Sequence, residues 1–146
     1  MSASTGKPQW RNLRILIVLT LIVLTVQGWT GDTTNLFVVT YTAAAANSFR
    51  GVIQNISGGG PILVWHAAEG VAIFAFSLAV LTMSLKSKPK SIRILAILGT
   101  FMVASAVMGA YLFVLSGFQD NAASAQMGGS FIGVYAFYFM ELYYAK

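Results

Sequence analysis

The residues best suited to chemistry lie close together in the sequence, in an apolar segment predicted to be helical that follows the glycine-rich loop Gly58-Gly59-Gly60. His66 is the only histidine of the chain, and Glu69 follows it three residues later. Residues at this spacing share one face of a helix. An imidazole can ligate a metal or heme iron, and a carboxyl beside it can orient the ring or relay protons. We therefore take His66 and Glu69 as the first candidates for a functional site.

The composition predicts that these two residues lie inside a membrane. Of 146 residues, 57% are apolar and only 9% are charged, which is far outside the range of ordinary soluble domains. The chain has no cysteine, and this excludes disulfides and thiolate metal sites. Its net charge of +5 is better explained by membrane orientation than by nucleic-acid binding, which we do not expect. Ionisable groups in a membrane helix are costly unless they are paired or liganded, so they mark functional candidates.

The hydropathy pattern predicts an all-α fold, an integral membrane four-helix bundle that forms a single domain. A helix needs about 20 apolar residues to cross the hydrocarbon core, and the predicted spans are residues 13–30, 61–85, 94–115 and 122–144. Residues 31–60 are too polar to span and are predicted to form an extracytoplasmic loop. Within this loop, residues 36–46 have the pattern of an interfacial helix, and Asn55 opens a glycosylation sequon.

Lysine and arginine are concentrated on one side of these spans. Arg50 alone falls on the other side, and the remaining basic residues are Lys7, Arg11, Arg14, Lys86, Lys88, Lys90, Arg93 and Lys146. Because basic segments stay on the cytoplasmic side, we predict a multi-pass protein of the cell membrane with both termini in the cytoplasm.

Side chains from other spans fall at the depth of His66, about 7 to 8 Å inside the second span. Gln27 lies near the outer end of the first span, with Thr20 and Thr34 on the same faint polar stripe, and Gln126 and Met127 lie at a similar depth in the fourth. One face of the second span is polar and is predicted to point into the bundle; it carries His66, Glu69, Gly70, Ile73, Ser77 and Ser84.

The fourth span also carries a ridge of small residues, Ala125-x-x-x-Gly129-x-x-x-Gly133. Such a ridge allows close approach of another helix or of a flat ligand such as a porphyrin. If the ridge faces the bundle interior, Gln126 lies beside it and Met127 points nearer a neighbouring helix.

The chain from Pro61 to Phe139 resembles one four-helix half of heme A synthase. The residues that carry the resemblance are His66-x-x-x-Gly70, the basic hairpin 86–93, Ala106-x-x-Gly109 with Tyr111-Leu112, and the polar turn before the fourth span. The resemblance implies a heme b held near the outer surface between histidines of the second and fourth spans.

This chain departs from the family at two positions. It keeps the first histidine at His66, but where the second is expected it has Ser124-Ala125-Gln126-Met127. The family's acidic residue comes one turn before the histidine, whereas Glu69 comes one turn after it. Iron would then be ligated by His66 and Met127, by His66 alone, or be absent. The resemblance does not carry the family's enzymatic activity to this chain.

Three functions agree with these residues. The first is a membrane heme b-binding protein or cytochrome-like subunit, in electron transfer or heme handling, with His66 as ligand and Glu69, Gln27, Gln126 and Met127 around the cofactor. The second is a cofactor-free accessory subunit of a larger respiratory or monooxygenase complex, in contact with other membrane subunits or with its own copies in the lipid bilayer. The third is a small metal-ion binder or transporter. We adopt the first, and we expect the chain not to act as a stand-alone enzyme.

Overall fold

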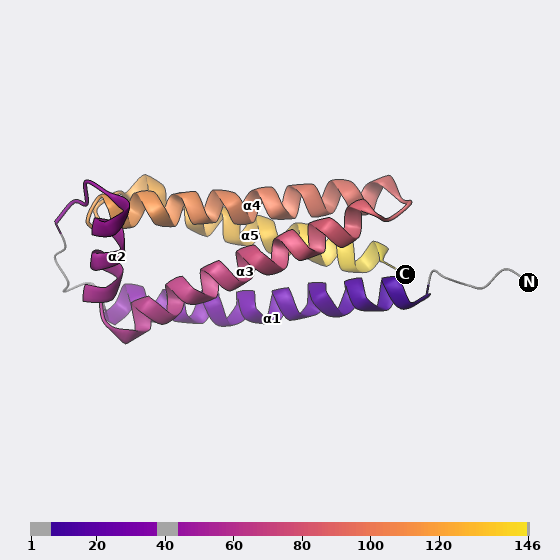
Figure 1. Ribbon diagram of the computed structural model, residues 1–146, viewed down its shortest axis with the longest axis horizontal. Helices are drawn as coiled ribbons and strands as arrows, with labels where there is room; N and C mark the ends of the chain where they lie inside the picture. The colour runs from indigo at the N-terminus through magenta and orange to yellow at the C-terminus, as the bar shows by residue number, and fades with distance from the viewer. Residues whose placement is uncertain (1–6, 38–43, 146) are drawn as a thin grey trace, which may run out of the picture.

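The computed structural model describes residues 7–37 and 44–145. Within these residues the chain contains helices and no strand, which confirms the predicted all-α class (Figure 1). The helices are α1 (Lys7–Phe37), α2 (Phe49–Gly58), α3 (Pro61–Leu85), α4 (Lys90–Leu115) and α5 (Asn121–Tyr144).

Three of the long helices are apolar enough to cross a membrane. They are Trp10–Thr34 within α1, Pro61–Leu85 and Lys90–Leu115. At 1.5 Å per residue, a helix of 25 residues is about 37 Å long, and this exceeds the hydrocarbon core of about 30 Å. α5 has a similar length, 24 residues, but is more polar and does not belong to this group.

The four long helices lie along one another, and the short α2 runs across one end of them (Figure 1). α4 and α5 make the most extensive contact, followed by α1 with α3 and by α3 with α4. α3 crosses the bundle obliquely, from α1 at the end near α2 to α4 at the end where α1 begins and α5 ends (Figure 1). The polar residues of its first two turns therefore face α1.

The segment predicted as a loop, residues 31–60, is helical in two parts. α1 continues to Phe37, and within this part of the helix the Thr33 and Thr34 hydroxyls donate to carbonyls of their own helix, at 2.8 Å each, so that neither hydroxyl is unsatisfied. α2 begins after Ser48, whose side chain caps the helix by accepting from Gly51 N. The interfacial helix predicted over 36–46 is wrong where it is described: residues 36 and 37 end α1, and residues 44–46 are not helical. Residues 38–43 lie outside the described residues.

Asn55, the first residue of the sequon, holds α2 against the end of α4. Its side-chain Nδ2 donates to Ala44 O at 3.0 Å and to Val114 O at 3.3 Å. A backbone bond from Ala46 N to Leu115 O, at 2.8 Å, adds to this connection. α2 thus closes the bundle end at which α3 begins.

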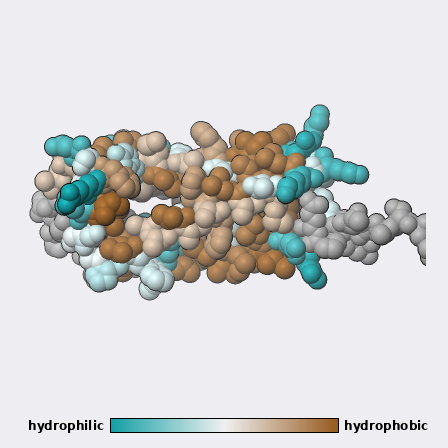
Figure 2. Space-filling model, viewed as in Figure 1, coloured by the Kyte–Doolittle hydropathy of each residue, from teal (hydrophilic) through white to brown (hydrophobic). Residues whose placement is uncertain are grey.

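Hydrophilic residues gather at the two ends of the molecule, with an apolar zone between them (Figure 2). One end carries the starts of α1 and α4, the end of α3, and with them the basic residues Arg11, Arg14, Lys86, Lys88, Lys90 and Arg93. We call this the basic end. The other end carries α2 and the first turns of α3 and α5.

The inward face of α3 is the one that the sequence predicted. Glu69, Ile73, Ser77 and Ser84 are all buried. Between the outer and inner polar residues of α3 lies Ile73, which belongs to the buried apolar core together with Leu24, Val103 and Val134 of the other long helices. We call these four residues the apolar layer. Ile73 is four residues, or about 6 Å, from both Glu69 and Ser77. The layer therefore divides the polar interior into an outer and an inner part.

Candidate functional site

Glu69 is the centre of a buried hydrogen-bonded cluster between α1 and α3. Its carboxyl group is only 7% exposed, and both of its oxygens accept hydrogen bonds. Thr30 Oγ1 on α1 donates to Glu69 Oε2 at 2.6 Å, and Trp65 Nε1 donates to Glu69 Oε1 at 2.6 Å. Short bonds to both oxygens satisfy the polar group that would be most costly in an apolar surrounding.

His66 joins the same cluster through Thr30. The Thr30 hydroxyl, on a residue only 3% exposed, lies 3.1 Å from His66 Nδ1. A hydroxyl carries one hydrogen and also accepts. The hydroxyl also lies 3.1 Å from Gln27 O of its own helix, but its shortest contact is the 2.6 Å bond to Glu69. With its one hydrogen in that bond it accepts from His66, which places the proton of the ring on Nδ1. His66, Thr30 and Glu69 thus form a directed chain of exchangeable protons, which we call the relay.

Gln27 completes the cluster on the other side of the histidine ring. Its Nε2 lies 3.3 Å from His66 Nε2 and 3.2 Å from His66 O. An amide nitrogen only donates, so His66 Nε2 accepts, in agreement with a proton on Nδ1. Gln27 Oε1 is buried and has no hydrogen-bond partner. The cluster therefore keeps one free acceptor next to the imidazole.

Glycines on α1 let the ring and its neighbours approach the helix backbone. A Cβ added to Gly31 would lie 3.0 Å from His66 Cε1, and one added to Gly28 would lie 2.7 Å from Phe131 Cζ. Phe131 belongs to α5, and one turn further Thr25 Oγ1 lies 2.6 Å from Tyr135 OH. The imidazole is thus packed against α1, with aromatic residues of α5 on the inner side of the cluster.

The structure does not bring the two fourth-span candidates into this cluster. Gln126 is exposed, and its Nε2 donates to Ser105 O and Ser105 Oγ on α4, at 3.0 and 3.2 Å. Met127 packs against Gly109 of α4, where an added Cβ would lie 3.1 Å from its Cγ. Both side chains therefore serve the contact between α4 and α5.

The small-residue ridge of α5 does not face the interior over most of its length. Ala125 and Gly129 are exposed, and a Cβ added at Gly129 would have no atom within 4 Å. Only Gly133 meets a neighbour, Met102. The face of α5 that meets α4 carries Ala123, Met127 and Ser130 instead.

The residues present do not fit a heme. Both ring nitrogens of His66 are engaged by Thr30 and Gln27, the ring lies against Gly31, and Met127 is turned to α4. An axial ligand needs a free nitrogen pointing into a space for the macrocycle. In the described part of the chain, no three histidine or acidic residues gather to hold another metal ion.

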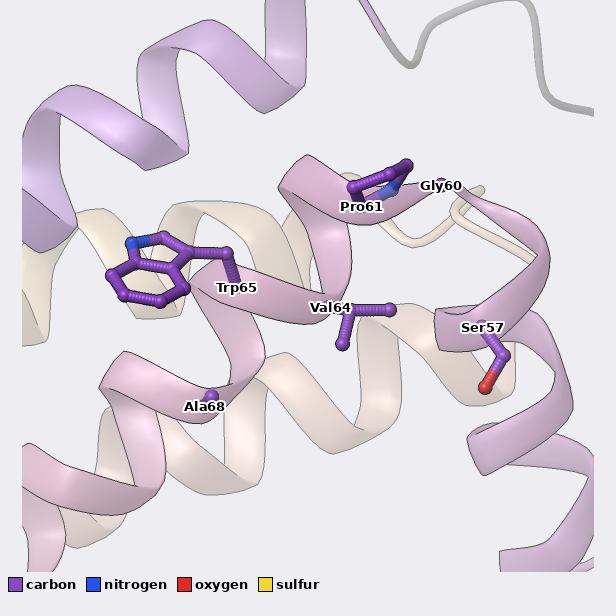
Figure 3. Close-up of a pocket in the computed structure, with 6 residues that line it drawn as sticks. All are labelled: Ser57, Gly60, Pro61, Val64, Trp65 and Ala68. Atoms are coloured by element: carbon purple, nitrogen blue, oxygen red, sulfur yellow. The ribbon is translucent and has the colours of Figure 1, made fainter.

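A hollow on the neighbouring face of α3 is also separate from the relay. It has a volume of about 390 Å³ and is lined by Ser57, Gly60, Pro61, Val64, Trp65 and Ala68 (Figure 3). Neither His66 nor Glu69 lines it. Trp65, which is 61% exposed, is the one residue that belongs to both features, since its ring lines the hollow and its Nε1 bonds Glu69.

Sequence reasoning found His66, Glu69 and Gln27 but missed Thr30 and Trp65. A signal for Thr30 was present, because it follows Gln27 by three residues and so lies on the same face of α1. Trp65 gave no comparable signal, since a tryptophan near the end of a membrane helix usually marks the interface.

Comparison of the chain with family models, with curated proteins and with solved structures finds no match. The resemblance to heme A synthase therefore stays a prediction from the residues alone. The function has to be argued from the geometry of the cluster.

Proposed function

We propose that this chain is a four-span protein of the cell membrane, with both termini in the cytoplasm, that binds and transfers a proton at the relay of His66, Thr30 and Glu69. Three helices long and apolar enough to span support the membrane location. α5 packs along α4 over its length, which supports a fourth span. The basic end supports the orientation, since basic segments stay in the cytoplasm.

The observation that carries the proposal is the unbroken hydrogen-bond chain from His66 to Glu69. Ionisable groups inside a membrane are rare, and chains of His and acidic residues there mark proton pathways. Glu69 and Thr30 are buried, whereas His66 is only half-buried. The histidine is therefore the member that exchanges protons with the outer side.

The relay step can be written with every proton accounted for. The Gln27 amide first rotates away from His66 Nε2, which then takes a proton from outer water, and the Nδ1 proton passes to Thr30 Oγ1. The hydroxyl proton of Thr30 passes to Glu69 Oε2, which leaves a neutral imidazole with its proton on Nε2. Rotation of the Gln27 amide then places the free Oε1 where it accepts from His66 Nε2. The unpartnered oxygen of Gln27 thus has a use in the second state of the relay.

The apolar layer lies directly inward of Glu69. Its four side chains contain no group that accepts a proton, and in the described part of the chain no hydrogen bond joins the neighbouring Thr25–Tyr135 hydroxyl pair to Glu69. Transfer past the layer therefore requires a change in helix packing or entry of water. We therefore propose gated transfer instead of an open channel.

Proton flux into liposomes tests this function. The purified chain is reconstituted with a pH-sensitive dye inside the vesicles, and a potassium gradient with valinomycin supplies the driving force. Wild type is expected to acidify the lumen faster than empty vesicles. Glu69→Gln and Thr30→Val should lose this excess flux, because each interrupts the relay.

The matched control is Thr33→Val, which removes a hydroxyl of α1 that bonds only the carbonyl of Trp29 in its own helix. This variant is expected to keep wild-type flux. Flux of wild type no greater than that of empty vesicles, over a range of potentials, would show that the proposal is wrong.

A second function is supported by the exposed face of α5. An added Cβ at Gly128 or Gly129 would meet nothing, and α5 is less apolar than the other long helices. Small residues at such positions favour close helix contact in membranes. We propose that this face contacts a further membrane subunit or a second copy. Copurification in mild detergent should be lost in Gly129→Leu, and a lone monomer in wild type would contradict this role.

A further inference from the structure

Glu141 is a second buried carboxyl group, at the basic end of the bundle. It is 0% exposed, although it lies only three residues before the end of α5 at Tyr144. Ser84 Oγ on α3 donates to its Oε1 at 2.5 Å. The other oxygen, Oε2, is buried and has no hydrogen-bond partner. A buried carboxyl group with one oxygen unsatisfied needs an explanation, since such groups are rare in folded proteins.

Three other buried polar atoms without a hydrogen-bond partner of good geometry lie in the same half of the bundle. Tyr138, one turn earlier on α5, is also 0% exposed, and its hydroxyl, which meets no such partner, lies near the side chains of Thr100 and Ser77. Ser87 Oγ, in the turn after α3, and Arg93 Nε, in the first turn of α4, are buried and unpartnered as well. Four of the five such atoms in the described chain thus belong to the basic half of the bundle.

The titratable and basic groups at this end of the bundle come from all four long helices. Tyr138 is the titratable neighbour on α5 itself, Lys86 follows α3, Arg93 lies in the first turn of α4, and Arg14 of α1 lines a hollow with Leu142. Among the described residues none of these cations forms an ion pair with Glu141, because its one contact is the Ser84 hydroxyl. The carboxyl group is therefore buried without any of these cations to neutralise it.

The distance to water at this end is short. Glu141 is about 4 to 5 Å from the end of α5, and Ser84 is the last residue but one of α3. We propose that Glu141, with Ser84 and Tyr138, is a proton-binding site that opens to the basic end of the molecule.

This inference rests on the proposed function, to which it adds the inner partner of the relay. Glu69 and Glu141 then bind protons on opposite sides of the apolar layer, and Ser77 and Thr100 lie between that layer and the inner site. Thr100 Oγ1 donates to Ser77 O at 3.2 Å. A proton that has passed the layer meets hydroxyl groups on its way to Glu141.

Infrared difference spectroscopy of the full chain in lipid tests the site without requiring flux. Spectra recorded at low and high pH are subtracted, so that each titrating carboxyl group gives a carbonyl band. Wild type is expected to show a band that is lost in Glu141→Gln and shifted in frequency in Ser84→Ala. Thr82→Val, which removes an exposed hydroxyl bonded only to Leu78 O, should leave the band unchanged.

The outcomes separate this site from the proposed function. Identical difference spectra for wild type and Glu141→Gln would overturn the inference even if vesicles show proton flux. A Glu141 band in a protein without flux would support the site while the proposed function fails. If Glu141→Gln does not fold, the Ser84→Ala spectrum decides, and no shifted band there overturns the inference. In a conducting protein, Glu141→Gln should reduce flux at least tenfold.

Discussion

Replacing Thr30 by valine separates a working relay from an ordinary helix contact. Valine keeps the shape of threonine but removes the hydroxyl that lies 3.1 Å from His66 Nδ1 and 2.6 Å from Glu69 Oε2. Two polar groups then lose a partner, and each unsatisfied buried group costs about 1 to 3 kcal/mol. Because His66 is half-buried and finds other partners more easily than Glu69, we expect the free energy of unfolding to fall by about 2 to 4 kcal/mol.

The assay is unfolding of the purified chain in mixed micelles, with the denaturing detergent increased in steps and helix content followed by circular dichroism. Thr33→Val serves as the control, because its hydroxyl bonds only its own helix. Its free energy of unfolding should change by less than about 0.5 kcal/mol.

A double-mutant cycle with Glu69→Gln then measures the coupling across the 2.6 Å bond. Contacting residues of one network couple by about 0.5 to 3 kcal/mol. Equal stability of the Thr30 and Thr33 variants, or strict additivity of the Thr30 and Glu69 substitutions, would refute the cluster as described.

Three further results are expected. Gly99→Ala should destabilise the chain by about 1 to 3 kcal/mol, because the added Cβ would lie 2.4 Å from Tyr138 Cε1. Gly129→Ala, where the added Cβ has no atom within 4 Å, should stabilise the chain by up to about 1 kcal/mol through helix propensity. Thermal unfolding of the two variants measures both effects. Trp65→Phe removes one donor from Glu69 and should cost about 1 kcal/mol in the same assay, less than Thr30→Val, because this side chain is exposed. The absorption spectrum of the purified protein should show no Soret band and should be unchanged in His66→Ala, since both ring nitrogens have other partners; a Soret band lost in that variant would restore the heme hypothesis.

Much of the helical framework was predictable because apolar runs and their breakers are local signals. Pro61 opens α3 in the position where a missing N–H is harmless, and the predicted boundaries 61–85 match that helix. The burial of Glu69, Ser77 and Ser84 also followed from their spacing on one helical face. α2 was not predicted, since its ten residues mix apolar, polar and glycine residues, are too few to span a membrane, and depend on a cap at Ser48 and on contact with α3 and α4.

The candidate site was predictable only in part, because it depends on how helices face one another. Periodicity placed Gln126 at the depth of His66, but not the rotation of α5 that turns Gln126 to Ser105. Thr30 was missed since a threonine in a membrane helix normally bonds its own backbone, as Thr20 does with Leu16 O. Only the antiparallel register of α1 and α3 turns Thr30 into the bridge between His66 and Glu69.

The apolar layer of Leu24, Ile73, Val103 and Val134 has a consequence for the electric field across the membrane. Where water reaches the polar side chains on each side of it, the membrane voltage falls mainly across these four residues. Moving one elementary charge through the full voltage is worth about 2.3 kcal/mol per 100 mV. A membrane potential would therefore act on a transferred proton mainly at the apolar layer. A polar residue in place of Ile73 is expected to let protons leak through the bundle.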